Sequence, residues 1–174
     1  MPDSTLSQAL KEAYAAAPSG VVIYHTLELR HPAFSSPIRV VRDFSDLTAT
    51  LEATAPADPG ATVTFVRFAF DFTKPEISTT GVPQMTIVID NVDRSIVANI
   101  EAALSTTSLV QATYREYIST DLSAPQNNPP ISMTILSLTA DVFRVRAVAG
   151  FPDLMNRRFP TLEYSAETFP GLIA

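Results

Sequence analysis

The sequence predicts a mainly β fold, a β-sandwich or small barrel flanked by an α-helix, and α+β in detail. About seven short segments alternate apolar and polar residues, which is the period of a β-strand. Short turns separate most of them, which favours antiparallel pairing. Proline (14 residues) outnumbers glycine (5), as expected for strands joined by stiff turns. The 174 residues are the size of a single domain, 1–174.

Residues 1–19 form a predicted helical appendage, with the helix itself over residues 3–17. Its apolar side chains recur at helical spacing. Asp3 or Ser4 is expected to cap the helix, and Pro18-Ser19-Gly20 is expected to end it. The apolar positions are Leu6, Leu10, Ala13, Tyr14 and Ala17.

Strands are predicted along most of the remaining chain. A strand over residues 21–31 is expected to pair with one over 37–44, because only the turn "HPAFSS" separates them. The stretch "APADPG", residues 55–60, predicts a turn. The other predicted strands cover residues 48–54, 61–72, 82–89, 108–119, 131–140 and 141–150.

Two of these strands carry specific predictions about their faces. Over residues 61–72, a row of Val66 and three phenylalanines is expected on one face, most simply in the core; the alternative is an aromatic wall that binds a ligand. Over residues 108–119, an apolar face is expected to oppose a polar face that includes Arg115. The phenylalanines are Phe68, Phe70 and Phe72.

An acidic corner, "IDNVDR", joins the strand at 82–89 to a predicted helix that runs to residue 104. Asp90 and Asn91 are residue types that cap helices, and Asp93 falls in the first turn, where negative charge is favoured. An acid–base or calcium site would need further carboxylates at defined offsets, which this corner lacks. We therefore interpret Asp90 and Asn91 as a helix cap. The apolar stripe of the helix is Val92, Ile96, Ile100, Ala103 and Leu104.

Residues 151–174 form a predicted extended arm. Three Phe-Pro pairs keep the residue before each proline out of the helical region. Apolar residues spaced in this way cannot form a compact core alone, so we expect them to pack on a neighbouring subunit. The expected inter-subunit contacts are Phe151, Arg157, Arg158, Phe159, Phe169 and Leu172.

The composition argues against most kinds of chemistry. There is no cysteine, and the two histidines, His25 and His31, are interpreted as one packed residue and one turn residue. No nucleophile, phosphate-binding or metalloprotease motif is present. We predict that the protein is not an enzyme and uses no metal or cofactor. The net charge of −6 and the lack of a basic run argue against tight DNA binding. No signal peptide and no membrane-inserting stretch is predicted.

Three stretches resemble a family of minor tail proteins from long-tailed bacteriophages that is carried as a domain of unknown function. They are "TLELRHPAF…PIRVVRDFSD", "GVPQMTIVIDNVDRSIVANI" and "RRFPTLEYSAETFPGL", and together they cover most of residues 20–172. The "IDNVDR" block and the "FPGL" ending are the most specific. The length of "TDLSAPQNNPP" does not align with the family pattern.

The resemblance implies a tail-tube-like fold assembled as a ring at the distal end of the tail, within the virion and made in the host cytoplasm. It implies a homo-oligomer, most simply a hexamer with a trimer as the alternative. Its partners are the tail tube protein, the tape measure protein and the tail hub, and DNA passes through without specific binding. We expect the ten arginines to lie mostly at subunit contacts. The alternatives are a small receptor- or carbohydrate-binding β-module of the virion and, with the least support, a hydrolase.

Overall fold

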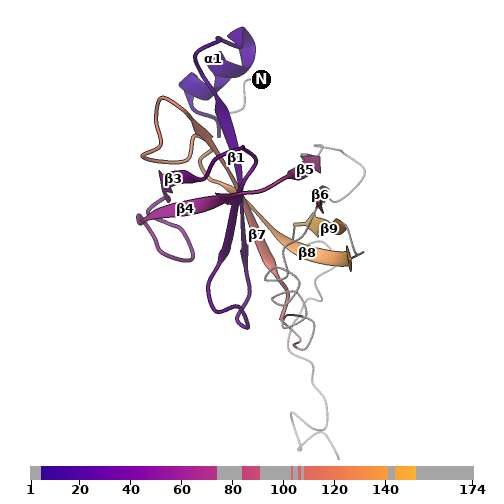
Figure 1. Cartoon of the computed structure of the whole chain (residues 1–174). Coiled ribbons are helices and arrows are strands. Elements are labelled where there is room, and N and C mark those ends of the chain that lie inside the picture. The colour runs from indigo at the N-terminus through magenta and orange to yellow at the C-terminus, as the bar shows by residue number, and fades with distance from the viewer. Residues whose placement is uncertain are drawn as a thin grey trace, which may run out of the picture.

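The computed structural model describes residues 5–73, 84–90, 103, 106, 108–140 and 144–151. The fold is mainly β, as predicted: nine strands form one sheet, and a single helix, α1 (Gln8–Ala16), lies at one end of this described part (Figure 1). The strands are β1 (Ile23–Arg30), β2 (Ile38–Val41), β3 (Leu47–Thr50), β4 (Thr62–Arg67), β5 (Phe70–Thr73), β6 (Gln84–Asp90), β7 (Gln111–Ile118), β8 (Ile131–Ala140) and β9 (Arg144–Gly150).

Helix α1 begins later than predicted. Ser7 is its N-cap, and the Ser7 hydroxyl accepts a hydrogen bond from a backbone N–H in the first turn at 3.1 Å. The prediction that Asp3 or Ser4 caps this helix is therefore wrong. The physical reason is that Leu6 forms an antiparallel bridge with Asn127, which keeps the chain extended just before the helix.

The strands follow the order β3-β4-β2-β1-β7-β8-β9-β6-β5 across the sheet. The predicted β1–β2 hairpin is confirmed, with Leu27 opposite Val40. All neighbouring strands are antiparallel except β2 and β4, which are parallel. The turn predicted at residues 55–60 is also present, and Gly60 has a φ of 68°, which favours glycine.

The single strand predicted over residues 61–72 is two strands, broken at Phe68 and Ala69. β4 pairs with β2, and β5 pairs with β6. The continuous segment of β4 and β5 is therefore hydrogen-bonded to both β2 and β6. Between β2 and β6 the sheet continues through β1, β7, β8 and β9. This arrangement closes the sheet into a small barrel. Strands β3 and β4 extend to the side of β1 away from β6 and β9 (Figure 1).

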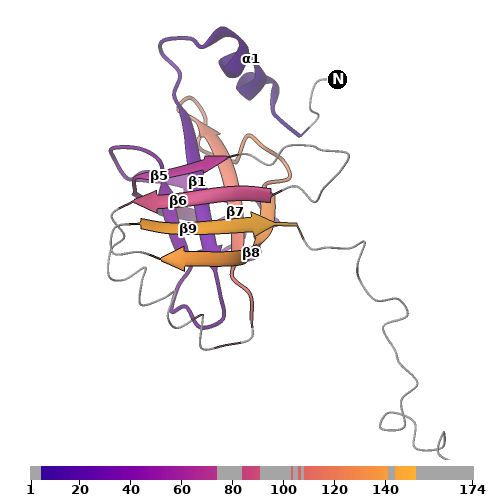
Figure 2. The same cartoon turned by 90° about the vertical axis from the view of Figure 1, so that its right-hand side faces the viewer.

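The main core fills the interior of this closed sheet. In Figure 2, strands β5, β6, β9 and β8 run crosswise in front of β1 and β7. β8 joins the two layers, because its residues up to Thr134 pair with β7 and its residues from Thr134 onward pair with β9, with an irregularity between Ile135 and Ser137. The predicted inward face of β6 is confirmed, since Met85, Ile87 and Ile89 are buried. The phenylalanine row lies here too: Phe70 is buried, and Phe68 and Phe72 pack against the core.

Strand β7 differs from its prediction, because both of its faces are buried. One face, with Ala112 and Tyr114, joins the main core. The other face carries Thr113, Arg115 and Tyr117, of which Tyr117 belongs to a second apolar cluster. This second cluster forms because β3 and β4 cover the outer side of β7. Its members are Val41, Leu47, Ala49, Leu51, Ala55, Phe65 and Tyr117.

Two predicted segments fall largely outside the described residues. Within the helix predicted after Asp90, the structure describes Ala103, which is helical and buried. Within the C-terminal arm it describes Phe151, which is partly buried and packs against the main core of its own chain. The cap at Asn91 and the remaining arm contacts stay predictions.

Candidate functional site

Two of the predicted site residues, Asp90 and Phe151, lie in the part of the chain that the structure describes. Asp90 is the last residue of β6 and lies opposite Arg144 of β9 in the strand register. Phe151 follows β9 directly. The residues outside the described ranges are Asn91, Arg157, Arg158, Phe159, Phe169 and Leu172.

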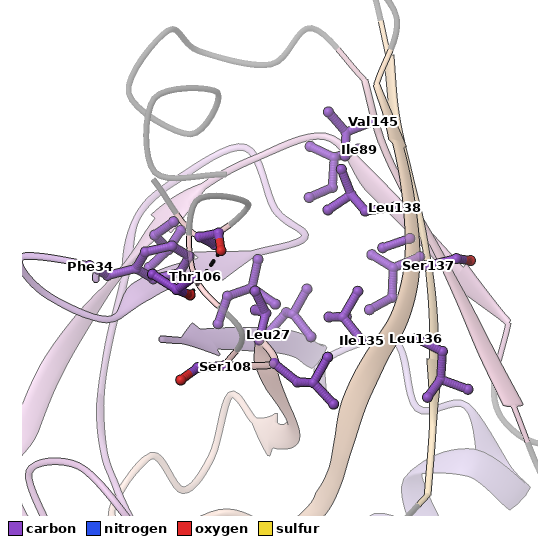
Figure 3. Close-up of a pocket in the computed structure, with 17 residues that line it drawn as sticks. Leu27, Phe34, Ile89, Thr106, Ser108, Ile135, Leu136, Ser137, Leu138 and Val145 are labelled. Atoms are coloured by element: carbon purple, nitrogen blue, oxygen red, sulfur yellow. Dashed lines mark hydrogen bonds between the residues drawn. The ribbon is translucent and has the colours of Figure 1, made fainter. Parts of the chain in front are cut away.

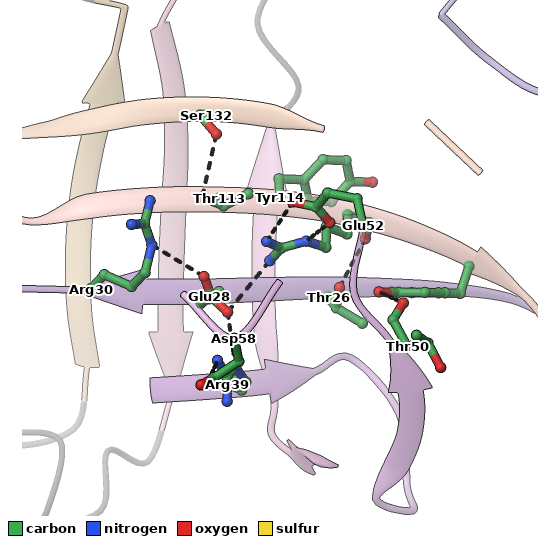
Figure 4. Close-up of polar contacts among 12 residues, drawn as sticks. Thr26, Glu28, Arg30, Arg39, Thr50, Glu52, Asp58, Thr113, Tyr114 and Ser132 are labelled. Carbon is green, nitrogen blue, oxygen red and sulfur yellow. Dashed lines mark hydrogen bonds and ion pairs between the residues drawn. The ribbon is translucent and has the colours of Figure 1, made fainter. Parts of the chain in front are cut away.

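The most developed polar arrangement is a buried charge network on the outer face of β1, β2 and β7 (Figure 4). Arg115 of β7 is fully buried and donates two hydrogen bonds to Glu52, from Nε to Oε2 at 2.7 Å and from Nη2 to Oε1 at 2.8 Å. Glu28 of β1 is also fully buried, and its Oε2 accepts a hydrogen bond from Arg39 Nε at 2.8 Å.

Two further residues complete the charge network. Arg39 donates a second hydrogen bond, from Nη2 to Asp58 Oδ2 at 2.6 Å. Arg30 Nε lies 3.1 Å from Glu28 Oε1, and Arg115 Nη1 lies 3.6 Å from Glu28 Oε2. The network therefore joins the cations Arg30, Arg39 and Arg115 to the anions Glu28, Glu52 and Asp58. Its charges balance, as buried charges in proteins generally must.

The charge network fastens the loop between β3 and β4 to the barrel. Glu52 and Asp58 both lie in this loop, and each binds an arginine of a barrel strand. Burial raises the pKa of Glu52, but the hydrogen bonds and charge of Arg115 outweigh this effect, so the pKa lies below its usual value. Burial lowers the pKa of Arg39, while Glu28 and Asp58 raise it by more. Glu52 and Arg39 are therefore held in their charged forms.

The network changes one expectation about the arginines. We expected them mostly at subunit contacts, but Arg30, Arg39 and Arg115 are committed to acids of their own chain, and Arg42 Nη1 lies 3.4 Å from Asp71. A sequence does not reveal whether an arginine's acidic partner is in its own chain or another. Each of these pairs joins two elements of the same chain and so supports the fold.

A second polar cluster lies under helix α1. The buried carboxylate of Glu116 accepts hydrogen bonds at Oε1 from the hydroxyl groups of Tyr114, at 2.5 Å, and Tyr14, at 2.8 Å. His25 Nδ1 lies 2.7 Å from the Tyr114 hydroxyl. Burial, with the nearby Glu116 charge, raises the pKa of Tyr114 far above its usual range. Tyr114 therefore stays protonated, and the cluster connects α1 to β1 and β7.

The two histidines form their hydrogen bonds in separate parts of the structure. His31 follows β1 and is buried; its Nε2 lies 3.1 Å from the Ser108 carbonyl oxygen and 3.0 Å from the Thr106 hydroxyl. His25 lies in β1 and His31 begins the turn after it, which agrees with the interpretation of the two as one packed residue and one turn residue. Among the side chains that the structure describes, no group of three or more His, Cys, Asp or Glu is placed to hold a metal ion.

An exposed aromatic side chain stands out on the surface. Phe44, in the turn between β2 and β3, is 96% exposed. The turn is fixed on both sides of it: Asp43 Oδ2 accepts a hydrogen bond from Ser45 Oγ at 3.1 Å, and Asp46 Oδ1 accepts one from the Arg67 backbone N–H at 2.9 Å. We call residues 43–46 the Phe44 turn.

An apolar pocket of about 230 Å³ lies between the two layers (Figure 3). Its walls are mainly aliphatic, with the hydroxyl groups of Thr106 and Ser108 on one side. Leu109 borders it and is 59% exposed. The pocket is lined by residues of β1, β6, β8 and β9 together with Phe34, Ile38 and residues 108–110.

Sequence reasoning missed several of these residues, although signals for two existed. Arg115 and Glu116 stand between Tyr114 and Tyr117 in one predicted strand, and charged residues among aromatic ones in a strand indicate partners on both faces. Phe44 stands in "RDFSD", an otherwise polar turn. Glu52 carried no comparable signal, because its partner Arg115 is 63 residues away in the chain. Glu28 and Arg39 lie opposite each other in the predicted hairpin, but the strand pattern does not show that Glu28 is buried.

Comparison with known proteins identifies one family. A family model described as "Domain of unknown function (DUF1833)" matches residues 9–164. No curated protein matches the chain significantly. Within the described ranges, no helix combines the length and the apolar character that a membrane span requires. Because the match covers most of the chain, the protein belongs to the DUF1833 family.

Proposed function

We propose that this protein is a structural virion protein that forms a ring at the distal end of a phage tail. The ring joins the tail tube to the tip and hub and surrounds the channel through which DNA leaves. It is built most simply from six copies, with three as the alternative. The tape measure protein is a further partner. The location in a phage tail rests on the resemblance of the three sequence stretches named above.

The observation that carries the assembly part of this proposal is the outer edge of β3, which its own chain covers only in part. This strand ends the strand order, so its outer side pairs with no strand of the described residues. Both backbone groups of Thr50 on this edge are bonded within the chain: its N–H donates to the Leu122 carbonyl at 2.9 Å, and its carbonyl accepts from the Tyr117 hydroxyl at 3.0 Å. Backbone groups alternate in direction along a strand, so those of Thr48 face the same edge. An edge strand of this kind is a template for pairing with another chain, and ring closure removes such edges.

The rigidity of this edge further supports assembly. Bidentate Arg115–Glu52 hydrogen bonding and the Arg39–Asp58 pair hold the loop that follows β3. The Tyr117 hydroxyl donates a hydrogen bond to the Thr50 carbonyl at 3.0 Å. A fixed edge loses little conformational freedom when it binds, which favours association.

The charge balance supports a channel that does not hold DNA. A net charge of −6 repels phosphates, and neutralised arginines release no counterions from DNA. Within the described residues, the arginines at positions 30, 39 and 115 are neutralised by buried or partly buried acids. A wall of this kind lets the genome slide during ejection.

Labelling of virions tests the proposal. Particles of the phage that encodes this chain are incubated with an antibody raised against the purified protein and imaged by electron microscopy. We expect label at the distal tail tip alone, and an antibody against the major capsid protein serves as the positional control. Label on the head, label along the whole tail or protein absent from purified particles would contradict the proposal.

The second candidate function is a receptor- or carbohydrate-binding module. Among the described features, the apolar pocket is the one that supports it. The aromatic row that favoured it from the sequence does not supply a binding wall, because Phe70 is buried and Phe68 and Phe72 pack against the core. Immobilised carbohydrate arrays test this candidate: saturable binding by the purified protein would favour it over the ring.

A further inference from the structure

The outer edge of β3 is uncovered at Thr48. Just beyond this strand the Leu51 N–H donates to the Ala61 carbonyl at 2.9 Å, which continues the β3–β4 register. Odd-numbered residues of β3 therefore bond to β4, and even-numbered residues point their backbone groups outward. Those of Thr50 are bonded within the chain, whereas those of Thr48 have no partner among the described residues. The edge from the Phe44 turn to Thr48 is thus open to an added strand.

The surface beside this part of the edge is acidic and carries an exposed aromatic ring. Phe44 is 96% exposed, and Asp43 and Asp46 stand on either side of it. Both carboxylates accept hydrogen bonds that hold the Phe44 turn in place. A strand that binds here with favourable charge and apolar contact would carry basic residues next to an apolar side chain.

The chain contains a segment of this kind at residues 153–159, "DLMNRRF". It lies between Pro152 and Pro160, so each of its residues has a backbone N–H that can join a sheet. Its basic pair, Arg157-Arg158, is followed directly by a phenylalanine. These three residues are among the inter-subunit contacts predicted from the sequence. The next stretch without proline, residues 161–169, has glutamates as its charged residues and matches the acidic turn less well.

Antiparallel pairing gives this segment a definite register on β3. With Arg158 opposite Asp46, the residue opposite Thr48 is Asn156, because paired residue numbers change in opposite directions. The segment then ends at the Phe44 turn, so Phe159 reaches Phe44 there. The basic pair and the two carboxylates of the turn lie together in this register.

The position of the segment in the chain favours a second copy as its partner. Phe151 follows β9 and packs against the main core of its own chain. The segment begins two residues later, and extended backbone spans at most about 7 Å over two residues. In contrast, β3 extends to the side of β1 away from β9 (Figure 1). The segment therefore starts near its own β9 and meets the β3 edge of another copy rather than its own.

We propose that residues 153–159 of one copy add an antiparallel strand to the uncovered edge of β3 in the next copy, with Arg157 and Arg158 toward Asp43 and Asp46. A segment of one copy and an edge of the next make a heterologous interface, the type that closes into rings. This inference rests on the proposed ring function and names the two surfaces that meet within the ring.

Disulfide trapping tests the contact, because the chain has no cysteine and introduced thiols report it without background. Full-length Thr48→Cys and Asn156→Cys chains, tagged to differ in mass, are mixed at high concentration and oxidised with glutathione. We expect disulfide-linked heterodimers, since directly opposite residues in paired strands lie within disulfide range. The control mixture replaces Thr48→Cys by Glu12→Cys, which is exposed on α1. Equal yields from the two mixtures would overturn the inference.

A chain with both substitutions, Thr48→Cys and Asn156→Cys, separates a neighbouring arm from the chain's own arm. Pairing between copies is expected to give a ladder of linked chains on a non-reducing gel. A linked monomer with an internal disulfide would show that the segment covers its own β3, and would overturn the inference.

Reversal of one charge tests the register by a different route. We expect Arg158→Glu to raise the dissociation constant of self-association, measured by analytical ultracentrifugation, by about tenfold or more, because it places like charges together. Lys11→Glu on α1 makes the same change of net charge outside the contact and is expected to leave association unchanged. Equal association by Arg158→Glu and the wild type would contradict the inference.

Failure of this contact and failure of the proposed function have different signatures. A ring seen in virions that forms equally well with Arg158→Glu would remove this inference and leave the proposed function intact. Linked Thr48→Cys and Asn156→Cys chains in a protein absent from tails would do the reverse.

Discussion

Arg115 and Glu52, which are 63 residues apart, meet through two parallel hydrogen bonds of 2.7 and 2.8 Å in a buried site. The pair joins β7 to the loop after β3 and lies beside the second apolar cluster. It thereby fixes the loop that follows β3, the strand whose outer edge supports the proposed assembly. Paired geometry of this kind is specific to the arginine guanidinium group.

Removal of Arg115 should strongly destabilise the fold. Arg115→Ala leaves Glu28 and Glu52 without this cation, and breaking a buried ion pair typically costs about 3–5 kcal/mol. The measurement is the free energy of unfolding in urea. The control is Arg42→Ala, whose exposed pair with Asp71 is expected to contribute about 0–1 kcal/mol. Similar losses for the two variants would contradict the assigned role of the network.

Acid should weaken the contribution of Glu52. The folded-state pKa of Glu52 is lowered, so the folded state binds fewer protons than the unfolded chain. The stabilisation is complete above the unfolded pKa of about 4.3 and is lost as the pH falls through the folded pKa. We therefore expect the difference in unfolding free energy between the wild type and Glu52→Gln to be large at pH 7 and to shrink near pH 3.

The control for this pH dependence is Glu12→Gln, on the exposed side of α1. It is expected to change the unfolding free energy little at either pH. A difference between wild type and Glu52→Gln that stays constant from pH 7 to pH 3 would show that the Arg115 pair does not govern this carboxyl group.

The hydroxyl of Tyr114 should matter more than that of Tyr117. Tyr114→Phe removes hydrogen bonds to the Glu116 carboxylate and to His25, and bonds to charged groups contribute about 1.5–3 kcal/mol. Tyr117→Phe removes one neutral bond to the Thr50 carbonyl, worth about 0.5–1.5 kcal/mol. Thermal or urea unfolding of both variants gives the comparison, and a larger loss for Tyr117→Phe would contradict it.

Truncation of the C-terminal arm should affect assembly more than folding. Removing residues 165–174 deletes one Phe-Pro pair and Leu172 but leaves every strand of the described fold intact. Unfolding free energy and self-association are measured on the same preparations. We expect the dissociation constant to rise while the stability stays close to that of the full chain. Unchanged association would argue against the arm as an inter-subunit contact.

The strands were predictable because each carries a local alternation of apolar and polar residues. The inward face of β6, with Met85, Ile87 and Ile89, followed from that pattern alone. The break at Phe68 did not, because the alternation continues through the bend and only the long-range pairing with β2 and β6 reveals it. The parallel pairing of β4 with β2 was hidden for the same reason.

Charged residues limited prediction of the candidate site. The alternation places Arg115 on the polar face of its strand, and arginine is rarely fully buried. Its burial depends on Glu52 and Glu28, which are distant in the chain and can be placed only once the β3–β4 pair covers β7. Phe44 is predicted as the last residue of a strand over 37–44, but β2 ends at Val41, so Phe44 falls in the turn that follows and is exposed there.

A reconstruction of the intact tail at a resolution that locates this subunit tests the central claim most directly. The account predicts a closed ring of copies, six or alternatively three, around a neutral to acidic channel between the tube and the hub, with the β3 edge of each copy facing a neighbour. A single copy on the axis, a position at the periphery away from the channel, or a channel lined with arginines would contradict it.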